Sequence, residues 1–174
     1  AKAAWLLALI PAFAFVHFLG FVPEIAAGEV VTGGYVWVPS FNLSFSWFID
    51  GLSLTFALLI TGIGTLIVLY AGGYMAGHPQ QGRFLAFLFL FMGAMLGVVV
   101  SDSLMMLFVY WELTSITSFL LIGFDHEREA SRRAALQALV VTGGGGLALL
   151  AGLIFIWNIS GTTQLSLLVH GGDV

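Results

Sequence analysis

The sequence has no cysteine and very little charge. Without cysteine, the 174-residue chain can form no disulfide, no cysteine-ligated zinc site and no thiol nucleophile. Only 8% of its residues are charged, against about 25% in an ordinary soluble domain, so the chain cannot cover a water-facing surface. The same shortage excludes a disordered segment, a coiled coil and a nucleic-acid-binding domain. With 60% hydrophobic residues, the sequence indicates an integral membrane protein.

Five stretches are long and apolar enough to cross a bilayer, whose hydrocarbon core of about 30 Å needs about 20 apolar residues per helix. They are residues 3–22, 51–74, 84–100, 102–124 and 133–157. The sequence therefore predicts an all-α integral membrane fold, a bundle of about five transmembrane helices. We expect residues 1–174 to form one membrane domain, in which residues 159–174 begin a non-cytoplasmic loop.

The segment between the first two spans has a different pattern. Gly33-Gly34 and Pro39 favour turns, and hydrophobic residues alternate with polar ones over residues 41–47. This pattern predicts a short extended or hairpin segment at the membrane surface. Asp50 and Asp102 each precede a predicted helix and are expected to cap its first turn.

The few basic residues predict the orientation. The five Lys and Arg residues are Lys2, Arg83, Arg128, Arg132 and Arg133. If five spans alternate in direction, all of these residues lie on one side of the membrane and none on the other. The positive-inside rule makes that side cytoplasmic, together with the N-terminus and the loops at 75–83 and 124–133.

One acidic residue stands apart from the other eight, which lie in loops or at helix ends. Glu112 comes ten residues after Asp102, which places it about 15 Å into the bilayer, at its midplane. An ionisable group there costs at least about 2.5 kcal/mol, so such groups usually mark an ion path or a proton relay. Ser115, Ser118 and Thr114 are close in sequence, and their hydroxyls can hydrogen-bond the carboxyl or hold water beside it.

Two interpretations of Glu112 remain open from the residues alone. Burial disfavours a charged carboxyl, whereas a nearby cation favours it. All five basic residues lie at one membrane edge, so either Glu112 works as a neutral acid or its partner lies in other sequence. The competing hypothesis is a protonated, hydrogen-bonded packing residue.

The remaining polar and glycine features are less specific. His17, in the first span, is either a relay group or an interface histidine. Gly93 and Gly97 favour close helix contact, and the run 143–146 either packs against a neighbour or loosens its helix. No histidines stand at metal-ligand spacing, and no cofactor motif is present.

The run Trp-Glu-Leu-Thr-Ser occupies residues 111–115 and is followed by a second motif at 119–124. These motifs resemble the antiporter-like subunits shared by respiratory complex I and the Mrp cation/proton antiporters, and the first is most similar to the MrpA branch of that family. Further similarities lie at 50–53, 83–84, 101–104, 134–136 and 140–142. Complex I members tend to carry Arg and Asp where this chain has Gly143 and Gly146, which favours the Mrp type.

The resemblance implies more than the residues show. It identifies Glu112 with the family's proton-translocating glutamate, whose lysine partner lies on a later helix. It implies that the chain is an N-terminal-region fragment of a larger protein with about fourteen helices and two inverted five-helix repeats.

The expected function is the proton path of a multisubunit Na⁺/H⁺ antiporter in the plasma (inner) membrane. Its expected partners are other membrane subunits, protons, Na⁺ and the lipid bilayer, with no nucleic acid, no cofactor and no catalysis of covalent change. The alternatives are a proton-pumping subunit of a respiratory oxidoreductase and a structural subunit that transports nothing.

Overall fold

A computed structural model describes residues 2–38 and 43–170. Its elements are α1 (Lys2–Leu19), α2 (Val22–Ala26), β1 (Val31–Val38), β2 (Leu43–Ile49), α3 (Gly51–Tyr74), α4 (Gln81–Val100), α5 (Leu104–Ile122), α6 (Glu129–Ser160) and α7 (Leu165–His170). Five helical segments are long and apolar enough to cross a membrane, the first combining α1 and α2. The predicted fold class is therefore confirmed.

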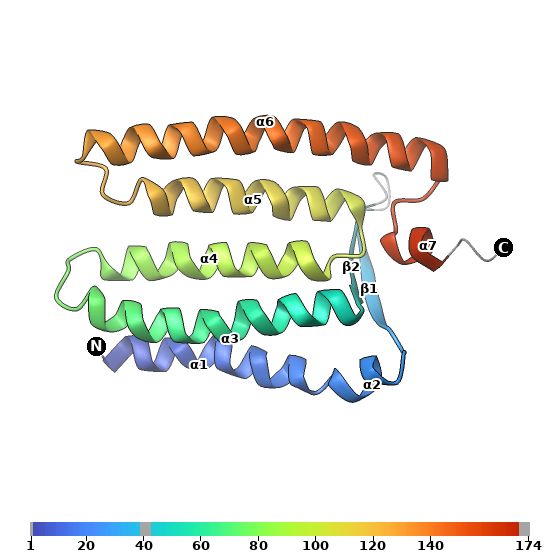
Figure 1. The fold of residues 1–174 in the computed structure, drawn as a ribbon, viewed down its shortest axis with the longest axis horizontal. Helices are drawn as coiled ribbons and strands as arrows, with labels where there is room; N and C mark the ends of the chain where they lie inside the picture. Colours follow the sequence, from blue (N-terminus) through green and yellow to red (C-terminus); the bar gives the residue numbers. More distant parts are fainter. Residues whose placement is uncertain (1, 39–42, 171–174) are drawn as a thin grey trace.

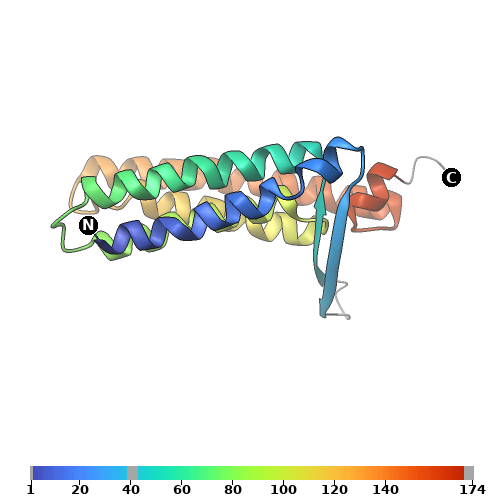
Figure 2. The same cartoon turned by 90° about the horizontal axis from the view of Figure 1, so that it is seen from below.

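The long helices lie side by side in chain order, α1, α3, α4, α5 and α6, and each packs against the next (Figure 1). Short connections join α3, α4, α5 and α6 as antiparallel neighbours, whereas α2 and the two strands lie between α1 and α3. The start of α1 and the α3–α4 and α5–α6 connections lie at one end of the bundle. The strands and α7 lie at the other end, which we call the hairpin end (Figure 2).

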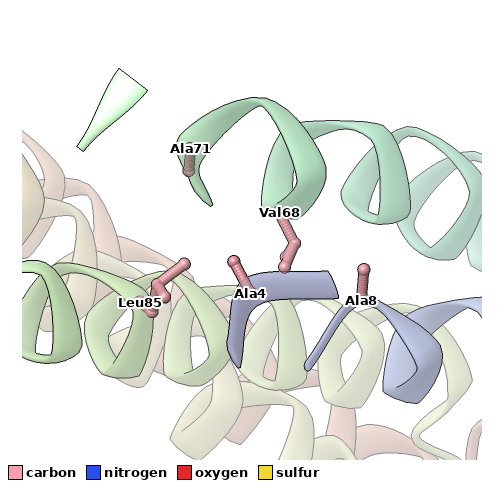
Figure 3. Close-up of a cluster of buried hydrophobic side chains, with 5 residues drawn as sticks. All are labelled: Ala4, Ala8, Val68, Ala71 and Leu85. Atoms are coloured by element: carbon pink, nitrogen blue, oxygen red, sulfur yellow. The ribbon is translucent and has the colours of Figure 1, made fainter. Parts of the chain in front are cut away.

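Small residues let the helices approach closely. Ala4, Ala8, Val68, Ala71 and Leu85 form a buried cluster where α1, α3 and α4 meet (Figure 3). A side chain at Gly72 would overlap Ala4, and one at Gly97 would overlap the ring of Tyr110. Without a hydrophobic driving force between helices in lipid, such close packing is a main source of association.

The glycine pair of α4 behaves differently from the prediction at one of its two positions. Gly97 receives the Tyr110 ring of α5, as expected for a close helix contact, but a side chain at Gly93 would meet nothing within 4 Å. Within the described residues, the expected close contact therefore occurs at Gly97 and not at Gly93, which is exposed.

The predicted hairpin is present. Strands β1 and β2 pair antiparallel, with Val31 opposite Ile49 and Gly33 opposite Trp47. The hairpin lies across the end of the bundle (Figure 2), where the Asp102 amide donates to the Ser46 carbonyl at 3.0 Å. Pro39 and residues 41–42, which also carried this prediction, lie outside the described residues.

Asp50 caps α3 as predicted. Its Oδ1 accepts from the Ser53 amide at 2.8 Å, and the Ser53 hydroxyl accepts from the Asp50 amide at 2.7 Å, which completes a capping box. Partial burial alone raises the pKa of the Asp50 carboxyl, but the hydrogen bonds from Ser53 outweigh it and hold the pKa below its usual 3.8.

Asp102 does not cap the helix that follows it, so that prediction is wrong. Ser103 takes the position instead and accepts from the Met106 amide at 3.4 Å. The Asp102 carboxylate accepts from the Ser166 amide at 2.7 Å and the Ser166 hydroxyl at 2.9 Å. It therefore holds α7, 64 residues away along the chain, against the α4–α5 connection.

The basic residues gather at the end of the bundle opposite the hairpin. Arg83 lies in the first turn of α4, and Arg128, Arg132 and Arg133 lie at the start of α6. Helix α1 begins at the same end (Figure 1). Arg128 pairs with Asp125 at 3.0 Å and Arg133 with Glu129 at 2.6 Å, both in exposed positions. We call this the basic end.

Candidate functional site

Glu112 lies at the middle of α5. It follows Leu104 by eight residues in a helix of 19, so it lies about 12 Å from the start of a helix about 28 Å long. Its Oε1 atom is buried and has no hydrogen-bond partner in the part of the chain that the structure describes. Buried polar atoms without a partner are uncommon and costly, so this oxygen needs an explanation.

The carboxyl of Glu112 is directed at the backbone of α6, which packs beside α5 (Figure 1). A Cβ atom built on Gly146 would overlap Oε1 and would lie 3.1 Å from the carboxyl carbon. Gly146 is buried and lies close to the centre of the 32-residue helix α6. The absence of a side chain at this position therefore provides the space that the carboxyl occupies.

The other glycines of the run make no such contact. A side chain at Gly143, Gly144 or Gly145 would meet nothing within 4 Å. Helix α6 is continuous through the run. Of the two interpretations of this run, close packing therefore applies at Gly146. The other three glycines have empty space where a side chain would lie.

The hydroxyls near Glu112 donate to their own helix. The Ser115 hydroxyl donates to the Trp111 carbonyl at 3.3 Å, the Ser118 hydroxyl to the Ser115 carbonyl at 2.9 Å, and the Thr114 hydroxyl to the Trp111 carbonyl at 2.6 Å. Their hydrogens are therefore engaged with backbone carbonyls rather than with Glu112 Oε1. Each oxygen keeps lone pairs that can accept from a water molecule.

His17, His78 and His126 are not brought to Glu112. His17 is exposed and meets the Phe18 and Phe21 rings edge-on at 5.9 and 5.1 Å. It lies on α1, at the opposite edge of the bundle from α6 (Figure 1). His78 and His126 line a cavity of about 620 Å³ at the basic end, together with Asp125 and Glu127.

Sequence reasoning found Glu112 but missed its contact with Gly146. The signal was present in part, since Glu112 and the glycine run both lie near the centres of successive predicted helices. Which of the four glycines meets the carboxyl depends on the rotation of α6 about its axis, which the sequence alone does not give.

Two family models match most of the chain. Residues 35–85 match the model described as NADH-Ubiquinone oxidoreductase (complex I), chain 5 N-terminus. Residues 101–172 match the model described as NADH:quinone oxidoreductase/Mrp antiporter, TM.

Individual relatives agree with these models. The A1 subunit of the Na(+)/H(+) antiporter of Staphylococcus haemolyticus is 47% identical over 152 residues, which cover 87% of this chain and 19% of that protein. The corresponding A1 subunit of Staphylococcus aureus is 45% identical with the same coverage. The chain thus spans about a fifth of the length of these relatives.

Solved structures share the fold. The Mrp complex of a Dietzia species superposes with a TM-score of 0.83 and 29% identity, over 94% of this chain and 17% of the matched chain. The membrane-bound sulfane sulfur reductase, an archaeal respiratory membrane complex, superposes with a TM-score of 0.74 over 92% of this chain and 24% of the matched chain. At 19% identity, the second likeness shows the fold alone. Together, the sequence matches and the superposed helices show that the chain belongs to the antiporter-like family of membrane subunits shared by NADH:quinone oxidoreductases and Mrp antiporters.

Proposed function

We propose that this chain forms part of the proton path of a multisubunit Na⁺/H⁺ antiporter, with Glu112 as the proton carrier. The observation that supports this role is the buried Oε1 atom of Glu112, which has no hydrogen-bond partner among the described residues. An ionisable group at membrane depth costs about 2.5 kcal/mol or more, and such groups are usually retained for function.

The same environment makes the carboxyl suitable for carrying a proton. A carboxyl oxygen that accepts no hydrogen bond from the described residues keeps its lone pairs free to bind a proton. The four arginines that the structure describes lie at the basic end, so they do not stabilise a carboxylate at the middle of α5. We propose that a basic group from outside the described residues allows release, as the lysine partner implied by the family resemblance would.

The hydroxyls beside Glu112 have a second role in this proposal. Ser115 is buried and lies three residues after Glu112, on the same side of α5. With Ser118 and Thr114 it offers acceptor oxygens whose hydrogens are engaged elsewhere. We propose that these oxygens hold water that delivers protons to the carboxyl.

The counter-ion, the partners and the orientation are part of the same proposal. The relatives are named as subunits of Na(+)/H(+) antiporters, and one solved relative is an Mrp complex. We infer that other membrane subunits complete the antiporter in the plasma membrane and that Na⁺ is the exported ion. By the positive-inside rule, the basic end faces the cytoplasm.

The proposal is tested by Na⁺-driven pH change in everted vesicles that carry the full-length protein with its partner subunits. Glu112→Gln and Glu112→Ala remove the titratable proton, so exchange should fall at least about a hundredfold. Glu127→Gln is the matched control, because Glu127 is exposed at the basic end, and it should leave exchange unchanged. Full exchange in both Glu112 variants would remove this residue from the mechanism.

A second candidate is a proton-pumping subunit of a respiratory oxidoreductase. It is favoured by the fold shared with the archaeal respiratory complex. Purification of the intact complex distinguishes the two candidate functions. A pump should co-purify with flavin or iron–sulfur centres and show quinone-dependent turnover. An antiporter should exchange ions without either.

A further inference from the structure

The contact between Glu112 and Gly146 is specific to one position of α6. Among the four consecutive glycines, a side chain would meet the carboxyl only at Gly146, whereas the positions at Gly143, Gly144 and Gly145 are open. The buried Oε1 atom is the atom that such a side chain would overlap. The position of the carboxyl against α6 therefore depends on a missing side chain at one residue.

We propose that Gly146 is a positioning residue that fixes where the Glu112 carboxyl sits between α5 and α6. The inference rests on the proposed role of Glu112 as the proton carrier. Gly146 does not itself bind the proton. It acts through the space that it leaves for the carboxyl beside the α6 backbone.

The fold should tolerate an alanine at this position. Gly146 is in regular helix and is not among the glycines with positive φ. Alanine is also a better helix former than glycine, by about 0.8–1 kcal/mol per residue. The atom that an added methyl group would displace is the far end of a flexible side chain, which can move to another rotamer at modest cost. The main consequence is a displaced carboxyl.

A displaced carboxyl should carry protons poorly, because proton transfer depends on the distances from the carboxyl to the groups that donate and accept the proton. Misplacement of a reacting group by about 1 Å can lower a rate by as much as a hundredfold. We expect Gly146→Ala to lower exchange about tenfold per molecule of assembled protein. The pH profile of exchange should also change, because the displaced carboxyl no longer has the same neighbours on α6.

The experiment compares Gly146→Ala with Gly145→Ala in the full-length protein and its complex, in everted vesicles over a range of pH. Gly145→Ala is the matched control, since it makes the same chemical change one residue away, where the space is open. It should preserve both the rate and the pH profile. Unchanged exchange and pH profile in Gly146→Ala, or equal losses in both variants, would overturn the inference.

A second variant keeps the inference testable if Gly146→Ala fails to assemble. Glu112→Asp shortens the side chain by one methylene and withdraws the carboxyl from α6. If the added methyl group blocks assembly through the carboxyl, the double variant with Glu112→Asp should restore the amount of assembled complex. If the double variant fails to assemble as well, the inference is wrong.

The outcome also separates this inference from the proposed function. If exchange is lost in Glu112→Gln but normal in Gly146→Ala, Glu112 remains the carrier and only the positioning role of Gly146 is rejected. Normal exchange in Glu112→Gln would reject the carrier itself.

Discussion

Two carboxyls, ten residues apart in sequence, have opposite environments. Asp102 is only 4% exposed at the hairpin end, and its carboxylate accepts hydrogen bonds from the amide and the hydroxyl of Ser166. Glu112 lies at the middle of α5, and its buried Oε1 accepts none from the described residues. The hydrogen bonds of the first carboxyl tie α7 to the α4–α5 connection, whereas the buried oxygen of the second holds no other element in place.

The comparison shows why burial alone does not identify a functional acid. A buried charge that keeps its hydrogen bonds stabilises local structure, and removing it leaves its donors unpaired. A buried acid without partners contributes little to stability, so its retention is better explained by function. Asp50 is partly exposed, as Glu112 is, but it is hydrogen-bonded, as Asp102 is, and it caps α3.

The largest expected effect on stability is at Asp102. Asp102→Ala removes the carboxylate that accepts from the Ser166 amide and hydroxyl, which should cost about 2 kcal/mol. Amide hydrogen exchange in α7 should then accelerate roughly thirtyfold. Asp102→Asn keeps one acceptor oxygen and should lose less. Unchanged amide exchange in Asp102→Ala would show that these hydrogen bonds do not hold α7.

A smaller effect is expected at Asp50. Asp50→Ala removes the cap of α3 and should cost about 1 kcal/mol, measured as a lower apparent Tm in detergent at pH 7. Because the folded pKa of Asp50 lies below its usual 3.8, the stabilisation by the charge is present above that value. It is lost as the pH falls through the folded pKa, so the penalty of Asp50→Ala should shrink in acid.

The control for this pH dependence is Asp50→Asn. The asparagine keeps a capping oxygen but cannot ionise. The difference in apparent Tm between Asp50→Asn and Asp50→Ala should therefore be the same at pH 7 and in acid. A penalty for Asp50→Ala that grows in acid would contradict the assignment of the carboxylate as the stabilising form.

The smallest effect on stability, and one of opposite sign, is expected at Glu112. Glu112→Leu replaces a half-buried carboxyl, whose buried Oε1 has no partner among the described residues, by an apolar side chain. The apparent Tm should stay the same or rise by an amount equivalent to about 1 kcal/mol or less, while exchange is lost. A clear fall in Tm would show that Glu112 makes stabilising contacts and would weaken the contrast with Asp102.

Most of the fold could be predicted from the sequence because membrane helices follow from length and hydropathy. The predicted span at 51–74 coincides with α3, and the one at 84–100 ends where α4 ends. Helix α6 extends beyond the predicted span 133–157, from Glu129 to Ser160. The polar ends of a membrane helix carry no hydropathy signal, so their bounds were underestimated.

The caps show where local reasoning succeeds and where it fails. Asp50 was identified correctly because its partner, Ser53, is three residues away and the capping box is a local motif. Asp102 was assigned to the wrong helix because its partner, Ser166, is 64 residues away in sequence. Only the return of the chain after Gly161, which ends α6 in a left-handed conformation with φ of 71°, brings the two together.

By itself, the sequence determined that this is a helical membrane protein with one acid near the middle of a predicted span and its basic residues in three separate segments. Composition and spacing suffice for that, since the bilayer sets the length of a span and the cost of a charge. Only the tertiary structure decided which face of α6 meets α5, and thereby that Gly146 receives the Glu112 carboxyl. The rotation of α6 is set by its packing against α5, so it cannot be read from the sequence of either helix alone.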